Sequence, residues 1–526
     1  MDFSNQDQDI FLVKLDRMID RGALLSRYSR AASLDIREVY RKEFEGNPFR
    51  GSDFYKRVFL EYGDESISEL VTAQMAAQNI SNVLTKAIED LRVGLSYLEK
   101  SSRYVRYDKK ISGKYLYLDS DKAGIPLNCA DDYISLCDSL FDFYVRSYEP
   151  ALKFFRERYP IDSILYSENG HGLRHIEDFA GEEKKAAEKS YTSSVRARAL
   201  DDLRFLLPAS TLTNLGISGN GRSYIHLVQK LRSTGIPEAL SVADSMYREL
   251  EKELPELIDS AVSKHGLELI QYSKDISSIP VKLPEQETRK LPEVELLQYD
   301  EDQKALKRAI SIYAFTTGET DLVTSYNAMS SKSRNELEHV IKKMAAMRNN
   351  RRHKLHRAFE SVSYLFQITT NYGAFRDLQR HRFISINRQP LSDRYGFDMP
   401  PLFEETSLRD EYSSLMTQAS EVYRKILQHS SRQVAQYAIP YAYRYPVSAF
   451  LNLREAVFFC ELRSTPQAHP DLRKIAIEMY SEIKKANPSL APLMKFVDQD
   501  EYSLGRLKSE QSKEQKLRRL NSGSNL

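Results

Sequence analysis

Cationic side chains that could bind an anion are concentrated between Gly373 and Tyr395. The triplet Arg380-His381-Arg382 interrupts a run that also contains Phe375 and Ile384. A guanidinium group is charged at any working pH, and its planar fork of donors matches the oxygens of a phosphate or a carboxylate. Burying several such groups among apolar residues is costly unless an anion neutralises them. The stretch is therefore either a solvated basic face or the binding site of an anionic ligand.

The order of residues after the triplet bears on this choice. Nine residues follow Arg382 before the element Ser392-x-Arg394-Tyr395 begins. This sequence pattern resembles the signature of the flavin-dependent thymidylate synthases (ThyX). In that family an Arg-His-Arg triplet is followed, after seven residues, by a serine that opens a Ser-x-Arg-Tyr element. The loop of this chain is longer by two residues, a departure that can reshape the pocket.

A second Ser-x-Arg-Tyr element, Ser101 to Tyr104, lies in the N-terminal half of the chain. It follows Asp90-Leu91-Arg92, which occupies the place of the triplet. Upstream, Gly63 to Glu69 resembles the Gly-His-Glu-Thr-Pro-Phe-Glu stretch of the family, with Asp64 in place of its histidine. The C-terminal half has Glu360 at the corresponding distance before its triplet.

The similarity between the halves continues downstream, where one spacing is repeated. Asn220 stands twelve positions after Pro208 in the first half, and Asn452 stands twelve positions after Pro440 in the second. Each asparagine opens an Asn-x-Arg element, and a helical segment then leads to a Leu-Arg pair. That pair is one residue out of register in the first half, at Arg232. An internal duplication is the simplest explanation of five ordered elements that occur twice.

These elements predict two tandem ThyX-like domains. The resemblance implies an α/β fold in which each half is a β-sheet with packed helices and the two halves form a pseudo-dimer. We expect the first domain at residues 1–275 with a surface insertion at about 110–195, a linker at 276–298, the second domain at 299–507 and a disordered tail at 508–526. Ser66 and Glu69 are spaced as a capping box, and the pattern from Ile67 to about Leu91 predicts a mainly helical segment.

The resemblance also implies an activity, the reductive methylation of deoxyuridine monophosphate (dUMP). FAD would be the redox cofactor, and methylenetetrahydrofolate and NADPH would be co-substrates. Carried over residue by residue, the resemblance assigns catalytic roles to Arg380, His381, Arg382 and Ser101. It assigns substrate binding to Glu99, Ser101, Arg103, Arg204, Ser392, Arg394 and Arg463. It assigns flavin binding to Ser66, Glu69, Glu360, Arg380, His381, Arg382, Asn387, Asn452 and Arg454.

Each half lacks mainly what the other retains. The first half has no triplet, and the second has Gln436 where Arg204 stands in the first. We therefore expect a composite site, in which the triplet and Arg463 face Arg204 and the loop that carries Arg103. Sites of this family lie between the subunits of a homotetramer, so two such doubled chains are expected to form a homodimer.

Two other functions remain open at this stage. The same flavin and folate chemistry could act on another uracil-containing substrate, such as a modified nucleotide or a nucleic acid. A non-catalytic protein could instead use Arg348–Arg357 and the triplet as a patch for nucleotides or RNA. A net charge of only +2 argues against nucleic acid as the main partner.

Composition places the chain among ordinary globular proteins. It has 526 residues, 41% of them hydrophobic and 29% charged, which favours more than one domain. Its apolar runs are shorter than the roughly 18 residues of a membrane-spanning helix. Three cysteines form neither a disulfide framework nor a metal-ligand pattern, so we expect no metal and a reducing cytoplasm. Cys460 is expected to be a small buried hydrophobic residue.

Overall fold

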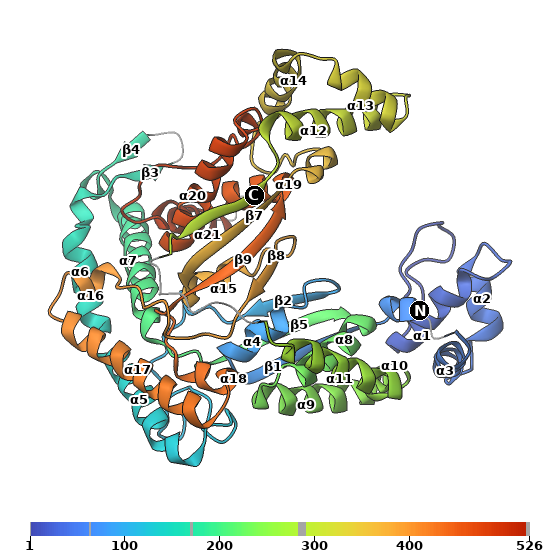
Figure 1. The fold of residues 1–526 in the computed structure, drawn as a ribbon, viewed down its shortest axis with the longest axis horizontal. Coiled ribbons are helices and arrows are strands. Elements are labelled where there is room, and N and C mark those ends of the chain that lie inside the picture. The colour runs from blue at the N-terminus through green and yellow to red at the C-terminus, as the bar shows by residue number, and fades with distance from the viewer. Residues whose placement is uncertain (1, 63–64, 169–171, 282–290, 522–526) are drawn as a thin grey trace.

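The computed structural model describes residues 2–62, 65–168, 172–281 and 291–521. Two antiparallel sheets lie at its centre, one from each half of the chain, with helices packed against them (Figure 1). The first sheet has the order β1 (Thr72–Ser81), β5 (Leu212–Asn220), β2 (Leu95–Glu99). The second has the order β6 (Val294–Tyr299), β7 (Ser363–Asn371), β9 (Arg444–Asn452), β8 (Ser385–Arg388). The α/β fold with one sheet in each half is confirmed.

Helices carry most of the remaining described residues. In the first half the α-helices are α1 (Met18–Tyr28), α2 (Ile36–Glu43), α3 (Arg50–Tyr62), α4 (Asn82–Glu89), α5 (Leu127–Arg146), α6 (Tyr148–Arg158), α7 (Gly181–Leu203), α8 (Gly221–Ser233), α9 (Pro237–Glu253), α10 (Pro255–Ile258) and α11 (Lys264–Ser278). In the second half they are α12 (Asp302–Thr317), α13 (Leu322–Ser330), α14 (Arg334–Met347), α15 (Tyr372–Leu378), α16 (Pro401–Glu404), α17 (Arg409–His429), α18 (Arg432–Ala435), α19 (Leu453–Arg463), α20 (Pro470–Ala486) and α21 (Leu507–Asn521). The hairpin of β3 (Tyr166–Glu168) and β4 (Gly172–Arg174) stands apart from both sheets.

The two halves share one plan, as the repeated motifs predicted. β5 pairs with β1 and β2, and β9 pairs in the same way with β7 and β8. Asn220 and Asn452 end these central strands and cap the next helices, each side chain accepting a backbone hydrogen bond at 2.9 Å from the third residue that follows. Residues 208–220 and 440–452 contain the equivalent strands β5 and β9, and each segment ends at a helix cap. The same spacing therefore occurs in both halves.

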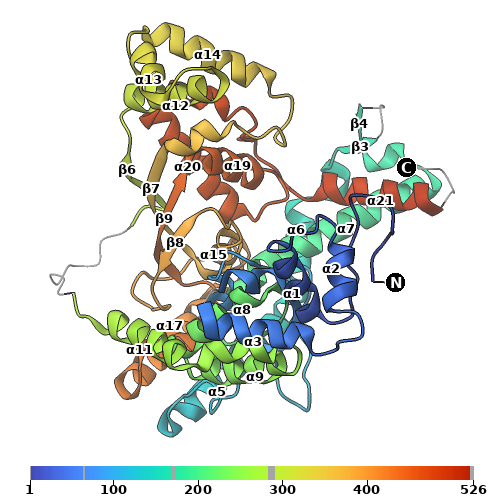
Figure 2. The same cartoon turned by 90° about the vertical axis from the view of Figure 1, so that its right-hand side faces the viewer.

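The halves join through backbone contacts near these prolines. Pro208 and Pro440 form an antiparallel bridge, the Ala209 amide donates to the Ile439 carbonyl at 2.8 Å, and the Tyr441 amide donates to the Leu207 carbonyl at 2.9 Å. The views at right angles show the first-half helices α8 and α9 below the second-half strands β8 and β9, with α15 close to the boundary (Figure 2). Elements from both halves therefore meet around α15.

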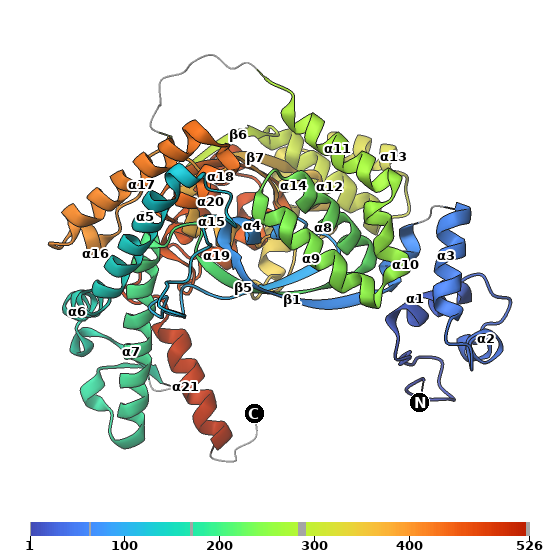
Figure 3. The ribbon, with the colours of Figure 1, turned by 90° about the horizontal axis from the view of Figure 1, so that it is seen from below.

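The segment expected to be a surface insertion is partly core. α5 lies beside α17 (Figures 1 and 3). Phe143 of α5 also packs against Phe403 of α16, with ring centres 5.7 Å apart and both side chains buried. The expectation failed because α5 is the counterpart of α17, and the residues without a counterpart are mainly those of α6, β3, β4 and α7. The insertion is also not confined to the surface, because α7 delivers Asp201 to the interior.

The expected disordered tail is wrong for residues 508–521. These residues form α21, which packs along α7 (Figure 2). Leu507 and Glu514 are buried against the rest of the fold, and Glu514 accepts from Lys189 of α7 at 2.9 Å. A charged composition misled the prediction, because the charges lie on the faces of an amphipathic helix. Residues 522–526 lie outside the described residues.

Two other boundaries need correction. The segment Ile67–Leu91, expected to be helical, is a 3₁₀ turn at Glu65–Leu70 followed by β1 and the short α4. Pairing of β1 with β5 overrides the local helical preference of its alanine- and glutamine-containing sequence. The expected linker at 276–298 is shorter than predicted, because α11 extends to Ser278 and β6 begins at Val294. Residues 282–290, like Gly63 and Asp64, lie outside the described residues.

The cysteines and the helix hydropathy complete the description. Cys129, Cys137 and Cys460 are buried and unpaired, and the expectation for Cys460 is confirmed by its place in α19. Among the described residues, every helix is too short or too polar to cross a membrane.

Candidate active site

Guanidinium groups from both halves converge on the carboxylate of Asp377, near the end of α15. Arg103 and Arg204 come from the first half, and Arg380 and Arg463 come from the second. Asp377 Oδ1 lies 3.6 Å from Arg380 Nη1, and its Oδ2 lies 3.9 Å from Arg204 Nη1. Burial alone would raise the pKa of Asp377, but the surrounding cations hold it well below its usual range. The structure thus brings together the four arginines from which the composite site was predicted.

Arg204 is the most unusual member of this cluster. It begins the 3₁₀ turn Arg204–Leu206 and is only 2% exposed, and burial lowers the pKa of its guanidinium to about 10. Its Nε and Nη2 atoms donate to no group among the described residues. The guanidinium packs against Gly373, where a Cβ would lie 3.1 Å from Arg204 Nε. A buried cation with unused donors is costly, and an anionic ligand would remove that cost.

Glu99 ties the Ser101–Arg103 loop to α15. It ends β2, is buried, and accepts hydrogen bonds from Arg376 Nη2 at 2.7 Å and from Lys86 Nζ at 3.1 Å. Arg376 Nη1 also donates to Ser102 Oγ at 3.1 Å. Burial would raise the pKa of Glu99, but the neighbouring cations lower it, so the carboxylate stays ionised. The loop that carries the first-half substrate residues is therefore held against the helix that leads into the triplet.

His381 orients Arg463. The Arg463 Nε–H donates to His381 Nε2 at 2.7 Å, and His381 Nδ1 lies 3.3 Å from Glu455 Oε1. Because arginine can only donate, the imidazole must accept at Nε2 and carry its proton on Nδ1, facing the Glu455 carboxylate. Burial lowers the pKa of His381, which favours this neutral form. Arg463 also donates to the Asp377 carbonyl at 3.3 Å.

Arg103 occupies the other side of the cluster. Its Nε and Nη2 donate to the two carboxylate oxygens of Asp201, at 2.7 and 2.8 Å. This bidentate geometry fixes the guanidinium in the plane of the carboxylate. Arg506 and His469 also face Asp201, and burial together with Arg204 lowers the pKa of His469 to about 3. The histidine is therefore neutral and adds no charge to the cluster.

A cavity of about 530 Å³, here called the α19 cavity, lies beside the cluster. It is lined by Arg348, Arg351, Lys354, Leu355, Arg357, Glu360, Phe383, Asn452, Arg454, Glu455, Val457 and Phe458. Three residues expected to bind flavin are therefore part of its wall: Glu360, Asn452 and Arg454. Glu360 Oε1 accepts from Arg454 Nη1 at 2.8 Å. Glu455 connects the cavity to the arginine cluster through His381 and Arg463.

Other predicted residues lie outside the arginine cluster. Arg394 is exposed, with its guanidinium 5.9 Å from the centre of the Tyr395 ring, and Ser392 shares that loop. Arg382 and Asn387 are exposed on and before β8. Ser101 is half-buried, and its Oγ accepts from the Arg103 amide at 3.3 Å. Ser66 and Glu69 belong to the first half, away from the residues that line the α19 cavity.

The first half has its own copy of the acid–arginine pair. Glu69 Oε1 accepts from Arg222 Nη1 at 2.8 Å, the same distance as between Glu360 and Arg454. Arg232, by contrast, turns to Asp244 of α9, at 2.7 Å. One residue of offset rotates a helical side chain by about 100°, so the out-of-register arginine reaches a different neighbour.

In the first half, the position that corresponds to Arg380 of the cluster is occupied by a carboxylate, which pairs with cations of this chain. Asp90, which corresponds to Arg380, accepts from Arg388 Nη2 at 2.7 Å and from Gln379 Nε2 at 2.5 Å. Burial would raise the pKa of Asp90, but Arg388 and Lys230 lower it. Arg388 and Lys230 thus share Asp90 as a fixed carboxylate partner. Arg204, in contrast, has buried donors without an acceptor.

Several residues of the site were not predicted as functional. They are Asp201, Arg376, Asp377, Glu455 and Arg506. Arg376 and Asp377 stood in the same stretch as the triplet, so their proximity was a usable signal. Nothing local marked Asp201, Glu455 or Arg506, because each reaches the site only through the tertiary fold. Among the described residues, no group of three or more His, Cys, Asp or Glu side chains is arranged to hold a metal ion.

Comparison with known proteins identifies relatives of the whole chain and of part of it. The sequence model of the family described as thymidylate synthase complementing protein matches residues 22–256 and 295–489. A protein of Thermoplasma acidophilum described as UPF0159 protein Ta1429 is 49% identical over 94% of this chain and 98% of its own length. A UPF0159 protein of Chlamydia pneumoniae is 34% identical over 97% of this chain and 96% of its own. A flavin-dependent thymidylate synthase of Thermococcus onnurineus is 29% identical over 23% of this chain and 52% of its own.

Proposed function

This chain belongs to the thymidylate synthase complementing protein family, and from that premise we propose that it is a flavin-dependent thymidylate synthase. In this proposal it methylates dUMP reductively, with FAD as cofactor and with methylenetetrahydrofolate and NADPH as co-substrates. Family membership supports an enzyme that acts on a dUMP-like substrate, and the arrangement of charged side chains supports the assignment of the site.

The observation that carries the proposal is the excess of cations around Asp377, among them the buried Arg204. Guanidinium groups outnumber carboxylates there, and Arg204 retains unused donors. The substrate phosphate is a dianion, which would compensate this excess. A fixed cation beside a pyrimidine carbonyl would also stabilise the negative charge that develops on the ring during attack. In this proposal Arg103 and Arg380, from different halves, act on the same nucleotide.

His381 and Glu455 would act by positioning. The neutral imidazole accepts from Arg463 and holds its guanidinium toward Asp377, while Glu455 fixes the tautomer of the imidazole. None of the three cysteines belongs to the cluster and all are buried, so the proposal assigns no role to a thiol nucleophile. Ser101 lies on the loop that Arg103 and Glu99 fix, where it could contact the nucleotide.

The side chains that line the α19 cavity suit the chemical groups of a flavin dinucleotide. Arg351, Lys354 and Arg357 supply cations for a pyrophosphate, and Phe383 and Phe458 supply apolar surface for a ring system. When bound, FAD supplies the redox chemistry that the side chains lack. The link from Glu455 through His381 to Arg463 would place the cofactor and the nucleotide next to each other.

The test is to purify the chain, measure flavin per chain, and follow dUMP-dependent oxidation of NADPH. Arg103→Ala and Arg380→Ala are each expected to lower kcat/KM by at least 10²-fold, because each removes a cation from the composite site. Arg394→Ala is the matched control and should change the rate little, since it lies outside the cluster. A large loss in Arg394→Ala with near-normal rates in the other two variants would contradict the composite site.

Two observations favour a second substrate within the same chemistry. Asp377 already provides a carboxylate at the centre of the arginines, and the Ser392 loop is longer than in the family. Both features could suit a uracil-containing nucleotide other than dUMP. Flavin-bearing protein that rescues no thymidine-requiring strain, yet oxidises NADPH with another uracil nucleotide, would favour this function.

A further inference from the structure

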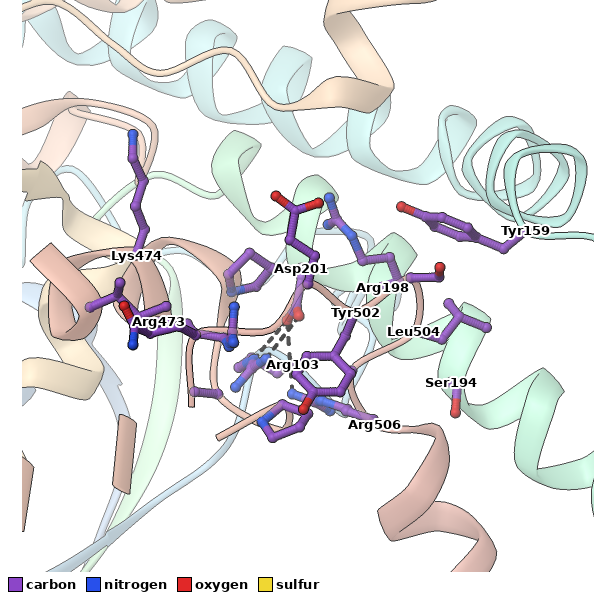
Figure 4. A pocket seen from close by; sticks show the side chains of 18 of the residues that line it. Arg103, Tyr159, Ser194, Arg198, Asp201, Arg473, Lys474, Tyr502, Leu504 and Arg506 are labelled. Atoms are coloured by element: carbon purple, nitrogen blue, oxygen red, sulfur yellow. Dashed lines mark hydrogen bonds and ion pairs between the residues drawn. The ribbon is translucent and has the colours of Figure 1, made fainter. Parts of the chain in front are cut away.

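A second cavity of about 530 Å³ has Arg103 and Asp201, but not Asp377, among the residues that line it, and is here called the α7 cavity. Its walls come from α7, from α20 with the loop before it, and from residues 499–506 (Figure 4). Its lining includes the rings of Tyr159 and Tyr502 and five cationic side chains: Arg103, Arg198, Arg473, Lys474 and Arg506. The wall formed by residues 499–506 lies beyond the part of the chain that matches the family, which ends at residue 489.

Four of these five cations have their own carboxylate partners. Arg103 is paired with Asp201, as described above, and Arg198 is paired with Asp202. Arg473 Nη2 lies 3.3 Å from Asp498 Oδ1. Lys474 Nζ lies 2.5 Å from Glu293 Oε1. These pairs leave Arg506 as the cation of the lining whose charge is least compensated.

Arg506 is buried without using its donors. It is only 6% exposed, and its Nε, Nη1 and Nη2 atoms donate to no group among the described residues. Its nearest carboxylate oxygen, Asp201 Oδ1, lies 3.9 Å away and already accepts from Arg103. The guanidinium stacks 4.4 Å from the centre of the Tyr104 ring. Burying three charged donors without acceptors is costly, and a ligand oxyanion would offset this cost.

Local packing holds Arg506 in this position. Gly505 approaches the loop before α20 so closely that a Cβ would lie 2.1 Å from the Pro466 carbonyl oxygen. Leu504 and Leu507, on either side, are buried. The backbone of Arg506 is therefore held at the wall of the cavity by a fixed turn just before α21, and its burial is not a consequence of a loose chain end.

We propose that the α7 cavity is a second anion-binding site, in which the Arg506 guanidinium receives the phosphate or carboxylate group of a ring-bearing organic anion. The free fork matches a tetrahedral or planar oxyanion, and a rotation of the side chain off the Tyr104 ring presents it to the cavity. The volume lies within the range of small-molecule sites. Tyr159 and Tyr502 offer flat surfaces for the ring. The proposal does not depend on flavin chemistry.

The site is coupled to the arginine cluster through Asp201. This carboxylate faces Arg506 on one side and binds Arg103 on the other. An oxyanion bound to Arg506 weakens the attraction between Arg506 and Asp201. Asp201 then interacts mainly with Arg103. Occupancy of the α7 cavity therefore strengthens the hold on Arg103 and changes the affinity of the cluster for its own ligand.

The experiment measures binding to the full chain by isothermal titration calorimetry at constant ionic strength. The probes are inorganic phosphate, uridine 5′-monophosphate and para-aminobenzoate, which distinguish a bare phosphate, a nucleotide and a ring carboxylate. Arg380→Gln is used as the background, so that anion binding at the composite site is weakened in every protein compared. In that background Arg506→Gln is expected to weaken the binding of at least one probe tenfold or more. The matched control, Lys508→Gln, changes an exposed cation two residues away and is expected to leave every affinity unchanged.

A stability measurement separates a ligand-binding role from a structural one. Without ligand, Arg506→Gln is expected to unfold at the same temperature as the parent or higher, because the substitution removes an uncompensated buried charge. Arg506→Lys keeps the charge without the fork and is expected to bind more weakly than the parent. The proposal is overturned if no probe binds the parent, if Arg506→Gln binds every probe as tightly as the parent, or if its sole effect is a lower Tm. Loss of flavin or of NADPH oxidation alone would affect only the proposed function.

Discussion

At the scale of single residues, the site is distinguished by where charge is left uncompensated. Asp90 accepts from Arg388, and Glu99 accepts from Arg376. Arg204 is the exception in the cluster, because two of its nitrogens are buried without acceptors. Natural folds seldom keep such a group unless it is used. The position of Arg204 therefore gives the sharpest residue-level test of the site.

Substituting Arg204 by glutamine is expected to separate function from stability. The second half already has Gln436 at the equivalent place, where its Oε1 accepts from the Leu391 amide at 3.3 Å. We expect Arg204→Gln to lower kcat/KM for dUMP by about 10²- to 10³-fold, the usual effect of losing one fixed donor. The free energy of unfolding, measured in urea, should stay equal or rise. The converse change, Gln436→Arg, should add no activity, and a rate loss there as large as in Arg204→Gln would argue against the assignment.

His469 gives a prediction about pH and stability. Its folded pKa, about 3, lies below the ordinary value of 6.5, so the unfolded chain binds the proton first as pH falls. The contribution to stability is therefore complete above pH 6.5 and is lost progressively below it, by about 1.4 kcal/mol at pH 5.5. His469→Asn keeps an acceptor for the Asp471 amide at the start of α20. It should lose less stability than the parent between pH 7.5 and 5.5, and equal losses in the two proteins would refute the prediction.

The sequence predicted some residues of the site and not others, for a physical reason. Arg103, Arg204, Arg380 and Arg463 were predicted because each stands in a short motif that occurs in order along the chain. Asp377 was visible beside the triplet, yet nothing local indicated that four guanidiniums would surround it. Arginine–carboxylate contacts between distant segments depend on how elements pack, and that information is not contained in spacing along the chain.

At the scale of elements, equivalent strands and helices of the two halves carry different functional residues. The strand, short helix and strand around the triplet recur as β1, α4 and β2, where Asp90 and Leu91 replace its first two members and only Arg92 remains. The repeated spacing allowed this correspondence to be predicted. The strand character of Thr72–Ser81 was missed, because pairing with β5 supplies the stability that its own residues lack. α21 was missed because its buried face is small and its composition is mostly charged.

The duplicated acid–arginine pair allows a matched comparison between the two halves. Arg454 lines the α19 cavity and is bound to Glu360, whereas Arg222 is bound to Glu69 in the first half. Arg454→Ala is expected to lower the flavin retained per chain at least tenfold, as measured by absorbance after desalting. Arg222→Ala should retain the parental amount, because it removes an ion pair of the same length from the other half. Equal flavin loss in both variants would place the cofactor elsewhere.

At the scale of the whole molecule, each sheet has exposed residues on one face among the residues that the structure describes. Helices α8, α9 and α11 lie on one side of β1 and β5 (Figure 3). On the other side Leu98, Gly216 and Ala76 form a row across the three strands, and all three are exposed. Phe450 and Ser385 are paired and exposed in the second sheet. Phe383, at the wall of the α19 cavity, is 80% exposed. Apolar side chains on open sheet faces favour association.

These open faces lead to the proposal that two chains form a homodimer related by a two-fold axis. A closed two-fold interface uses the same surface on both subunits, so one substitution alters it twice. Leu98 is 81% exposed near the centre of the first open face, and Leu98→Glu would place two charges in the interface. Light scattering after size exclusion is expected to give about twice 60.8 kDa for the parent and a single-chain mass for this variant. Leu127→Glu is the control, because Leu127 is 95% exposed at the start of α5, and it should stay dimeric. A parent of single-chain mass, with flavin bound and turnover intact, would show that one chain holds a complete site and that the open faces serve another purpose.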